Sequence, residues 1–154
     1  MEIENIENFL PHRKPMLLLD SVSLDDGVAR GKLHIKGDEW FLQGHFPDAP
    51  VTPGVILCEI LAQTSAFLLK DGIPENVTPF LVGLDSVRLK RMVQPGETFC
   101  SECRVHSVKE PFYFTDCKGY VDGQLSVKAR LFFALVDKNK ESAKKPAGPT
   151  EQKD

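Results

Sequence analysis

The distribution of hydrophobic and polar residues along the chain predicts one long buried helix. From residue 53 to residue 69, apolar side chains fall on every side of a helix, and no glycine or proline interrupts the segment after Gly54. A helix that is apolar all round is normally enclosed by the rest of its domain. We therefore expect a central, buried helix over residues 53–69.

The other apolar residues lie in short segments separated by turn residues. Residues 16–24 and 28–35 flank Asp25-Asp26-Gly27, which is a strong hairpin signal. Four more strand-like segments are expected at 80–92, 98–108, 112–121 and 124–136. Short strands joined by turns predict an antiparallel sheet. Together with the helix, they predict an α+β domain in which a curved sheet wraps one long central helix, the arrangement called a hot-dog fold.

The two ends of the chain differ from this middle part. Residues 2–10 carry apolar side chains at helical spacing, which predicts a short amphipathic helix covering part of the core. Residues 138–154 contain no Val, Ile, Leu or aromatic residue and cannot bury enough surface to order themselves. We therefore expect a single domain over residues 1–137 and a disordered C-terminal tail over residues 138–154.

Composition and charge exclude several classes of protein. The 154 residues are 42% hydrophobic, enough for one core, and the net charge of -3 offers no general attraction to nucleic acid or to an anionic membrane. The N-terminus lacks the basic and apolar regions of a secretory signal, and the apolar stretches are too short to span a bilayer. A cytoplasmic protein with its four cysteines as free thiols is expected.

The most informative segment lies just before the predicted central helix. His45 is followed by three prolines, at positions 47, 50 and 53, and prolines fix φ and restrict the residue before them. His45 is thus expected on a rigid loop. A neutral imidazole, with a reference pKa of about 6.5, is a suitable general base at physiological pH, so His45 is a candidate catalytic base.

A carboxyl group lies within the helix itself. Glu59 is surrounded in sequence by apolar residues, where an ionised carboxylate would be poorly solvated. We therefore expect a raised pKa, which would let Glu59 act as a general acid. Gln63, four residues further on, shares its helix face and is expected to orient it.

The start of the helix suits the stabilisation of negative charge. Pro53 fits the first helical turn, where a missing N–H costs nothing, and Gly54 lets another molecule approach the backbone closely. The backbone N–H of Gly54, near the positive end of the helix, could stabilise a developing oxyanion.

Taken together, these segments resemble the 3-hydroxyacyl-acyl carrier protein dehydratases of type II fatty acid synthesis. Two signatures carry the resemblance, which covers nearly the whole chain. The N-terminal one is Leu10-Pro11-His12-Arg13 with Pro15 and Leu18-Leu19-Asp20, and the active-site one is Gly44-His45-Phe46-Pro47 with Pro53-Gly54-Val55, Glu59 and Ala62-Gln63. Asp48, Thr52, Cys58 and Ile60 depart from the residues more usual in the family.

The resemblance implies removal of water from a 3-hydroxyacyl thioester, with His45 as base, Glu59 as acid, substrate contacts at Gly54 and Val55, and support from Pro53 and Gln63. It also implies a homodimer whose two catalytic residues come from different protomers, often assembled further as three dimers, and neither a metal nor an organic cofactor. The related dehydratase-isomerases usually carry Asp in place of Glu59, which favours dehydration alone.

Two other functions remain open at this point. A hot-dog thioesterase would direct water at the thioester carbonyl, and a non-catalytic acyl-binding protein would keep the fold without the chemistry. Retention of both His45 and Glu59 argues against each.

Other residues allow functional and ordinary structural interpretations. Cys100, Cys103 and His106 are residue types that bind zinc, but a strand would send the two cysteines to opposite faces. His12, His34 and His106 are expected to be surface or packing residues. Arg88, Lys90 and Arg91 form the best local basic patch, which we interpret as a docking site for an acidic acyl carrier protein with its phosphopantetheine-linked substrate, or otherwise as plain surface charge.

Overall fold

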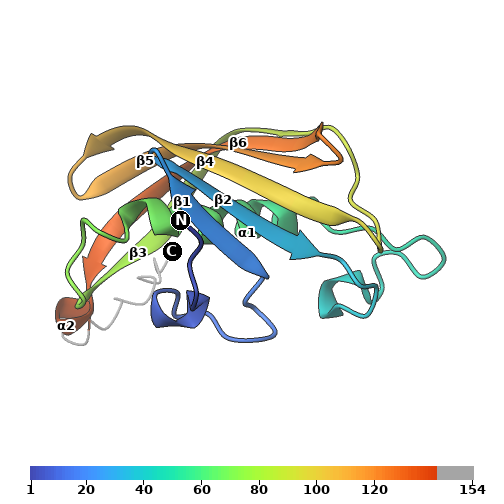
Figure 1. Ribbon diagram of the computed structural model, residues 1–154, viewed down its shortest axis with the longest axis horizontal. Helices are drawn as coiled ribbons and strands as arrows, with labels where there is room; N and C mark the ends of the chain where they lie inside the picture. The colour runs from blue at the N-terminus through green and yellow to red at the C-terminus, as the bar shows by residue number, and fades with distance from the viewer. Residues whose placement is uncertain (142–154) are drawn as a thin grey trace, which may run out of the picture.

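A six-stranded antiparallel sheet in the order β1-β2-β4-β5-β6-β3 forms most of the protein (Figure 1). The computed structural model describes residues 1–141. The strands are β1 (Ser21–Asp25), β2 (Val28–His34), β3 (Val77–Leu89), β4 (Thr98–Lys109), β5 (Phe112–Val121) and β6 (Gln124–Asp137). The first two strands form the predicted hairpin, and β4, β5 and β6 follow one another as neighbours, as expected for strands joined by tight turns.

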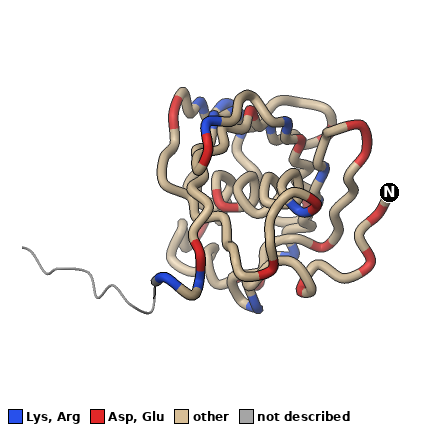
Figure 2. Tube along the Cα trace, turned by 90° about the vertical axis from the view of Figure 1, so that its left-hand side faces the viewer, with Lys and Arg blue, Asp and Glu red and all other residues tan. Residues whose placement is uncertain are grey.

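The central helix α1 (Gly54–Ala66) lies against the inner face of this sheet and continues into the 3-10 helix η3 (Phe67–Leu69). Ten of its 13 residues are buried, as the unbroken apolar sequence predicts. The sheet curves over the helix in Figure 1, and Figure 2 shows α1 in the middle of the molecule with most charged residues around the outside. The α+β hot-dog fold is therefore confirmed.

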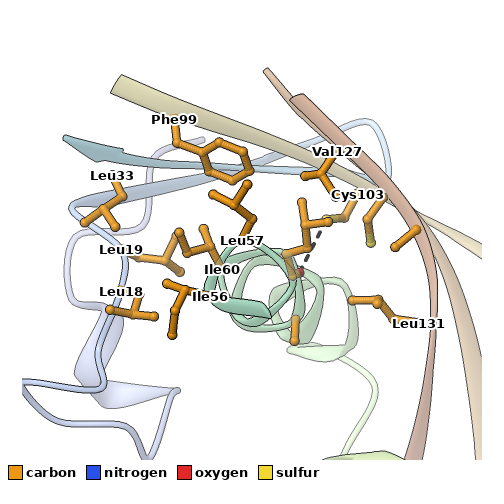
Figure 3. Packing of buried hydrophobic residues seen from close by; sticks show 14 of the residues in the cluster. Leu18, Leu19, Leu33, Ile56, Leu57, Ile60, Phe99, Cys103, Val127 and Leu131 are labelled. Atoms are coloured by element: carbon orange, nitrogen blue, oxygen red, sulfur yellow. Dashed lines mark hydrogen bonds between the residues drawn. The ribbon is translucent and has the colours of Figure 1, made fainter. Parts of the chain in front are cut away.

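Helix and sheet meet in one hydrophobic core. Leu57 of α1 points toward Phe99 of β4, and Ile56 points toward Leu18 and Leu19 of the segment before β1 (Figure 3). The close approach of the two layers depends on a residue with no side chain, Gly31 in β2. A Cβ atom there would lie 2.5 Å from Oγ1 of Thr64.

The predicted helix over residues 2–10 is wrong for its first half. The N–H of Ile3 donates to the carbonyl of Val22 at 2.8 Å, and Glu2 forms an isolated bridge with Ser23. Only one 3-10 turn, η1 (Ile6–Asn8), follows. The free edge of β1 offers backbone hydrogen bonds to this segment, and a short isolated helix is too weak to compete with them.

Several other boundaries differ from the prediction. The strand expected at residues 80–92 runs instead from Val77 to Leu89. The strand expected from residue 16 begins at Ser21, because the amides of Met16 and Leu17 donate to the carbonyl of Arg13 in a turn. At the other end, α2 (Lys138–Glu141) occupies the first four residues of the expected tail, and residues 142–154 lie outside the described chain. Within residues 1–141, no helix is both long and apolar enough to cross a membrane.

Candidate active site

His45 lies in a tightly bonded loop between the 3-10 helix η2 (Trp40–Leu42) and α1. Its N–H donates to the carbonyl of Leu42 at 3.0 Å, and its carbonyl accepts from Val51 at 3.0 Å. The ring nitrogen Nδ1 lies 2.8 Å from the carbonyl oxygen of Val51. Because a carbonyl can only accept, Nδ1 must carry a proton, so in the neutral imidazole the lone pair lies on Nε2. The loop therefore holds the imidazole in the tautomer that a base requires.

The residue after the histidine limits how the ring can move. The rings of Phe46 and His45 stack with centroids 4.3 Å apart and planes inclined by 24°. Phe46 also closes the loop, since its backbone exchanges two hydrogen bonds with Ala49, at 3.3 and 3.1 Å. These contacts agree with the rigid loop predicted from the prolines.

Glu59 lies in the second turn of α1, with a side chain that is 26% exposed. Its Oε1 accepts a hydrogen bond from Nε2 of Gln63 at 2.9 Å. The Nε2 atom of His12 lies 3.3 Å from the same oxygen. His12 belongs to the loop that follows η1, so the N-terminal segment contributes directly to the surroundings of this carboxyl group.

The predicted direction of the Glu59 pKa is wrong for this chain. Burial does raise the pKa, as expected from the apolar neighbours in sequence, but the hydrogen bonds from His12 and Gln63 act in the opposite direction, and the pKa of Glu59 is lowered overall. Both donors stabilise the ionised form. His12 comes from a segment distant in sequence, so the helix alone could not indicate its effect.

Gln63 connects the helix to the chain segment before β1. Its side chain is almost fully buried, at 1% exposure. Its Oε1 accepts from the N–H of Leu18 at 2.9 Å, and its Nε2 donates to the carbonyl of Met16 at 2.8 Å as well as to Glu59. Gln63 thus contacts Glu59, as its position on the same helix face predicts, and it also fixes the position of residues 16–18.

The N-terminus of α1 presents free backbone donors. Pro53 is the N-cap, one position earlier than predicted, and no side chain caps the first N–H groups of the helix. Val55 is 76% exposed. A Cβ at Gly54 would lie 2.5 Å from Cδ1 of Leu89, so the close approach that requires glycine here is made by β3 of the same chain.

A groove of 780 Å³ opens beside Glu59. Polar groups at one part of its wall are Glu59, Gln63 and His12, and the apolar part includes Phe80 and Phe133. Its lining residues do not include His45. Within one chain, the structure therefore does not bring the two predicted catalytic side chains together on this groove.

The predicted basic patch is divided by an ion pair. Arg91 donates to both carboxylate oxygens of Glu97, at 2.8 and 3.0 Å, and to Gln124 at 2.8 Å. Arg88 and Lys90 are exposed. Arg91 is therefore engaged within its own fold, and the patch available to a partner is smaller than the sequence indicates.

The cysteines and histidines considered for zinc do not converge. Cys103 is fully buried, whereas Cys100 occupies the opposite face of β4, as its strand position predicts. His106 lies instead 3.2 Å from Asp116. Across residues 1–141, no three His, Cys, Asp or Glu side chains are grouped as metal ligands would be.

His12 is the site residue that reasoning from the sequence missed. It was expected at the surface or in packing, yet it contacts Glu59. The available signal was its place in Leu10-Pro11-His12-Arg13, the N-terminal signature of the family that the chain resembles.

Known proteins resemble this chain along most of its length. The family described as the FabA-like domain matches residues 10–130. A 3-hydroxyacyl-acyl-carrier-protein dehydratase FabZ from Natranaerobius thermophilus is 40% identical over 141 residues, covering 89% of this chain and 99% of the relative. The FabZ of Staphylococcus epidermidis is 37% identical over 139 residues, covering 88% and 96%.

Solved structures agree at the level of the fold. A dehydratase heterocomplex, ApeI:P from Xenorhabdus doucetiae, matches with a TM-score of 0.74 and 21% identity over 90% of this chain and 95% of that one. A thioesterase superfamily member from Thermus thermophilus matches with a TM-score of 0.66 and 13% identity, over 85% and 91%. The sequence relatives distinguish between these two kinds of neighbour: the chain belongs to the FabA-like family, among the FabZ-type 3-hydroxyacyl-acyl-carrier-protein dehydratases.

Proposed function

We propose that this protein is a hydro-lyase that removes water from 3-hydroxyacyl-acyl carrier protein and yields the trans-2-enoyl product in fatty acid biosynthesis. The observation that carries this conclusion is the match along almost the whole length of curated dehydratases, at 40% identity for the relative from Natranaerobius. The thioesterase alternative rests on structural neighbours of low identity, which share only the fold.

In the proposed mechanism, Nε2 of His45 removes the proton at C2 of the substrate. Its proton on Nδ1 is held by the Val51 carbonyl, so Nε2 is the atom available to accept. Glu59 in its protonated form, which the hydrogen bonds from His12 and Gln63 make a stronger acid by lowering its pKa, gives a proton to the hydroxyl at C3, which leaves as water. The free N–H groups at the start of α1, beginning with Gly54, are placed to stabilise charge on the thioester oxygen, with Val55 beside them against the substrate.

We propose further that each active site is built from two copies of the chain, with His45 from one and Glu59 from the other. The absence of His45 from the lining of the groove beside Glu59 supports this arrangement. β3 supports it too, because within residues 1–141 it is an edge strand that pairs with β6 alone, and it exposes Phe80, Val82 and Leu84. An exposed apolar edge strand favours pairing with another chain. A homodimer assembled further as three dimers is the proposed oligomer.

Carrier-protein docking is proposed at Arg88 and Lys90, with Arg91 in a supporting position only. Arg88 lies directly opposite Lys128 in the sheet, and Lys128 lies opposite Lys118, so three cations occupy neighbouring strands in one row. An acidic carrier would be attracted to such a row. Because this substrate is delivered by a water-soluble protein, the proposed location is the cytoplasm.

One assay separates the candidate functions. The protein is incubated with a 3-hydroxyacyl thioester of the carrier protein, and the products are examined for enoyl thioester, free thiol or neither. Enoyl product supports the dehydratase, free thiol the thioesterase, and neither a binding protein. An isomerised 3-enoyl product would add a second activity.

The same assay tests the two proposed catalytic residues. His45→Ala and Glu59→Gln are each expected to lower kcat by about 10²-fold or more, the usual scale for a general base or acid. His34→Ala is the matched control, because His34 is an exposed histidine whose ring bonds to Thr98 away from the groove. Turnover near that of the control in either variant would remove that residue from the mechanism.

A further inference from the structure

His12 contacts Glu59 but takes no direct part in the proton transfers of the proposed mechanism. Two nitrogen atoms approach the same carboxylate oxygen, because Nε2 of His12 lies 3.3 Å and Nε2 of Gln63 lies 2.9 Å from Oε1 of Glu59. Among the described residues, neither an ion pair nor a hydrogen bond involves Oε2 of Glu59. The two oxygens of this carboxyl group are therefore not equivalent.

The surroundings of the other ring nitrogen of His12, Nδ1, indicate which ring nitrogen carries the proton. Nδ1 is buried and has no hydrogen-bond partner among the described residues. A proton on Nδ1, either in the cation or in the other neutral tautomer, would be a buried donor without an acceptor, which is unfavourable. The neutral tautomer with its proton on Nε2 avoids this cost and directs an N–H at Glu59.

We propose that His12 is a positioning residue that acts as a neutral hydrogen-bond donor, fills Oε1 of Glu59 together with Gln63, and thereby confines the transferable proton of the acid to Oε2. The proposal rests on the proposed function of Glu59 as the acid. A second donor at Oε1 also gives the N-terminal loop a chemical task.

The arrangement favours the proton transfer itself. As the Oε2–H bond breaks, its proton joins the C3 hydroxyl, and the C3–O bond breaks with its electron pair leaving on water. The C2 proton passes to Nε2 of His45, and the electron pair of the C2–H bond forms the C2=C3 double bond. Negative charge then grows on the carboxylate and is shared with Oε1. Hydrogen bonds to a charged acceptor are stronger than those to a neutral one, so both donors stabilise the transition state more than the protonated form of Glu59 from which the transfer starts.

The other charged residues that line the groove do not explain why the pKa of Glu59 is lowered. The remaining charged residues that line the groove are Glu7, Arg13, Lys70, Glu75 and Lys138. Arg13 is paired with Glu7 at 3.6 Å. In the described part of the chain, His12 is the basic residue that pairs with Glu59, and the lowered pKa of Glu59 agrees with donors at Oε1.

Three substitutions at His12 separate a donor from a titrating group. Glutamine places an amide nitrogen near the position of the histidine Nε2, asparagine places one near that of Nδ1, and leucine supplies no donor. Each variant is tested in the full-length protein, after circular dichroism confirms its fold. The Glu59 carboxyl is titrated by 13C NMR with a Glu59→Gln sample for assignment, and kcat and KM are measured with the 3-hydroxyacyl carrier substrate.

We expect His12→Gln to keep the Glu59 titration and kcat close to wild type. His12→Leu and His12→Asn should raise the pKa of Glu59 and lower kcat by about tenfold or more, with a smaller change in KM, as for the loss of a hydrogen bond to a charged group. An unchanged Glu59 titration in His12→Leu would overturn the proposal. So would a His12→Gln variant as impaired as His12→Leu, because the imidazole would then be needed for more than its N–H. If the wild-type protein forms no enoyl product, the proposed function fails, whereas the carboxyl titration still decides whether His12 donates to Glu59.

Discussion

Replacing Gln63 by leucine would remove the three hydrogen bonds that join α1 to the segment before β1 and to Glu59. The leucine side chain would fill a similar volume, so the main change is polar. The N–H of Leu18, a residue only 4% exposed, would lose its acceptor, and the carbonyl of Met16 would lose its donor. Glu59 would lose its shorter hydrogen bond at the same time.

The size of the effect follows from the burial of these groups. A buried donor left unpaired costs about 1–3 kcal/mol, and we assign most of that cost to Leu18. Met16 is 39% exposed, so its carbonyl can exchange its partner for water at a smaller cost. The added apolar side chain offsets part of the loss. We expect a net decrease of about 2 kcal/mol in the free energy of unfolding, a large part of the typical range of about 5–15 kcal/mol.

Urea unfolding measured through Trp40 fluorescence tests this expectation. Trp40 is the single tryptophan, and its indole N–H donates to the carbonyl of Pro15 at 3.1 Å, close to the segment that Gln63 holds. Protein concentration must be held fixed because an oligomer is expected.

Ser65→Ala is the control for this measurement. Ser65 is also buried on α1, but in the described part of the chain its hydroxyl hydrogen-bonds only to the side chains of Thr115 and Cys117, so its removal leaves none of the described backbone groups unpaired. We expect a loss of about 1 kcal/mol or less for the control. A decrease for Gln63→Leu no larger than that of the control would refute the reasoning.

Three further predictions concern stability. Gly31→Ala should cost about 1–3 kcal/mol by thermal unfolding, because the new Cβ would lie 2.5 Å from a hydroxyl oxygen of α1, whereas Gly72→Ala, with its nearest atom at 3.9 Å, should be tolerated. Equal Tm values for the two variants would contradict this. Thr52→Val should raise stability by up to about 1 kcal/mol, since Thr52 is 4% exposed and its hydroxyl has no partner among the described residues; a clear loss would show that the hydroxyl is bonded. The hydrogen bond from Arg91 lowers the pKa of Glu97 in the folded protein, so the pair stabilises at neutral pH and this contribution is lost as the pH falls through that lowered pKa. The stability gap between wild type and Arg91→Leu should therefore close in acid, and a gap that is constant with pH would argue against the pair as its source.

Local pattern was sufficient for most of the secondary structure. The run of apolar residues around Ile60 required a buried helix wherever the rest of the chain went, and Asp25-Asp26-Gly27 required a turn whose geometry pairs the strands on either side. The first residues were predicted wrongly because their apolar spacing fits a helix, whereas the edge of β1 gives Ile3 a partner that no local signal reveals.

The sequence likewise predicted only part of the candidate site. The order of His45, the prolines, Gly54 and Glu59 along the sequence identified the loop and the helix that carry the chemistry, since those residues are close in the chain. The sequence could state that Glu59 would be surrounded by apolar neighbours, and burial does raise its pKa. It could not state that His12 would lie against the same carboxylate and help reverse the net effect.

What the sequence by itself determined is therefore the kind of element each segment forms and the residues able to exchange protons, because propensity and hydrophobic period act over a few neighbouring positions. Only the tertiary structure decided which polar partners those residues meet: Val51 for His45, His12 and Gln63 for Glu59, and Glu97 for Arg91. Protonation state and orientation depend on these contacts within a few ångströms, and such contacts exist only once the chain has folded.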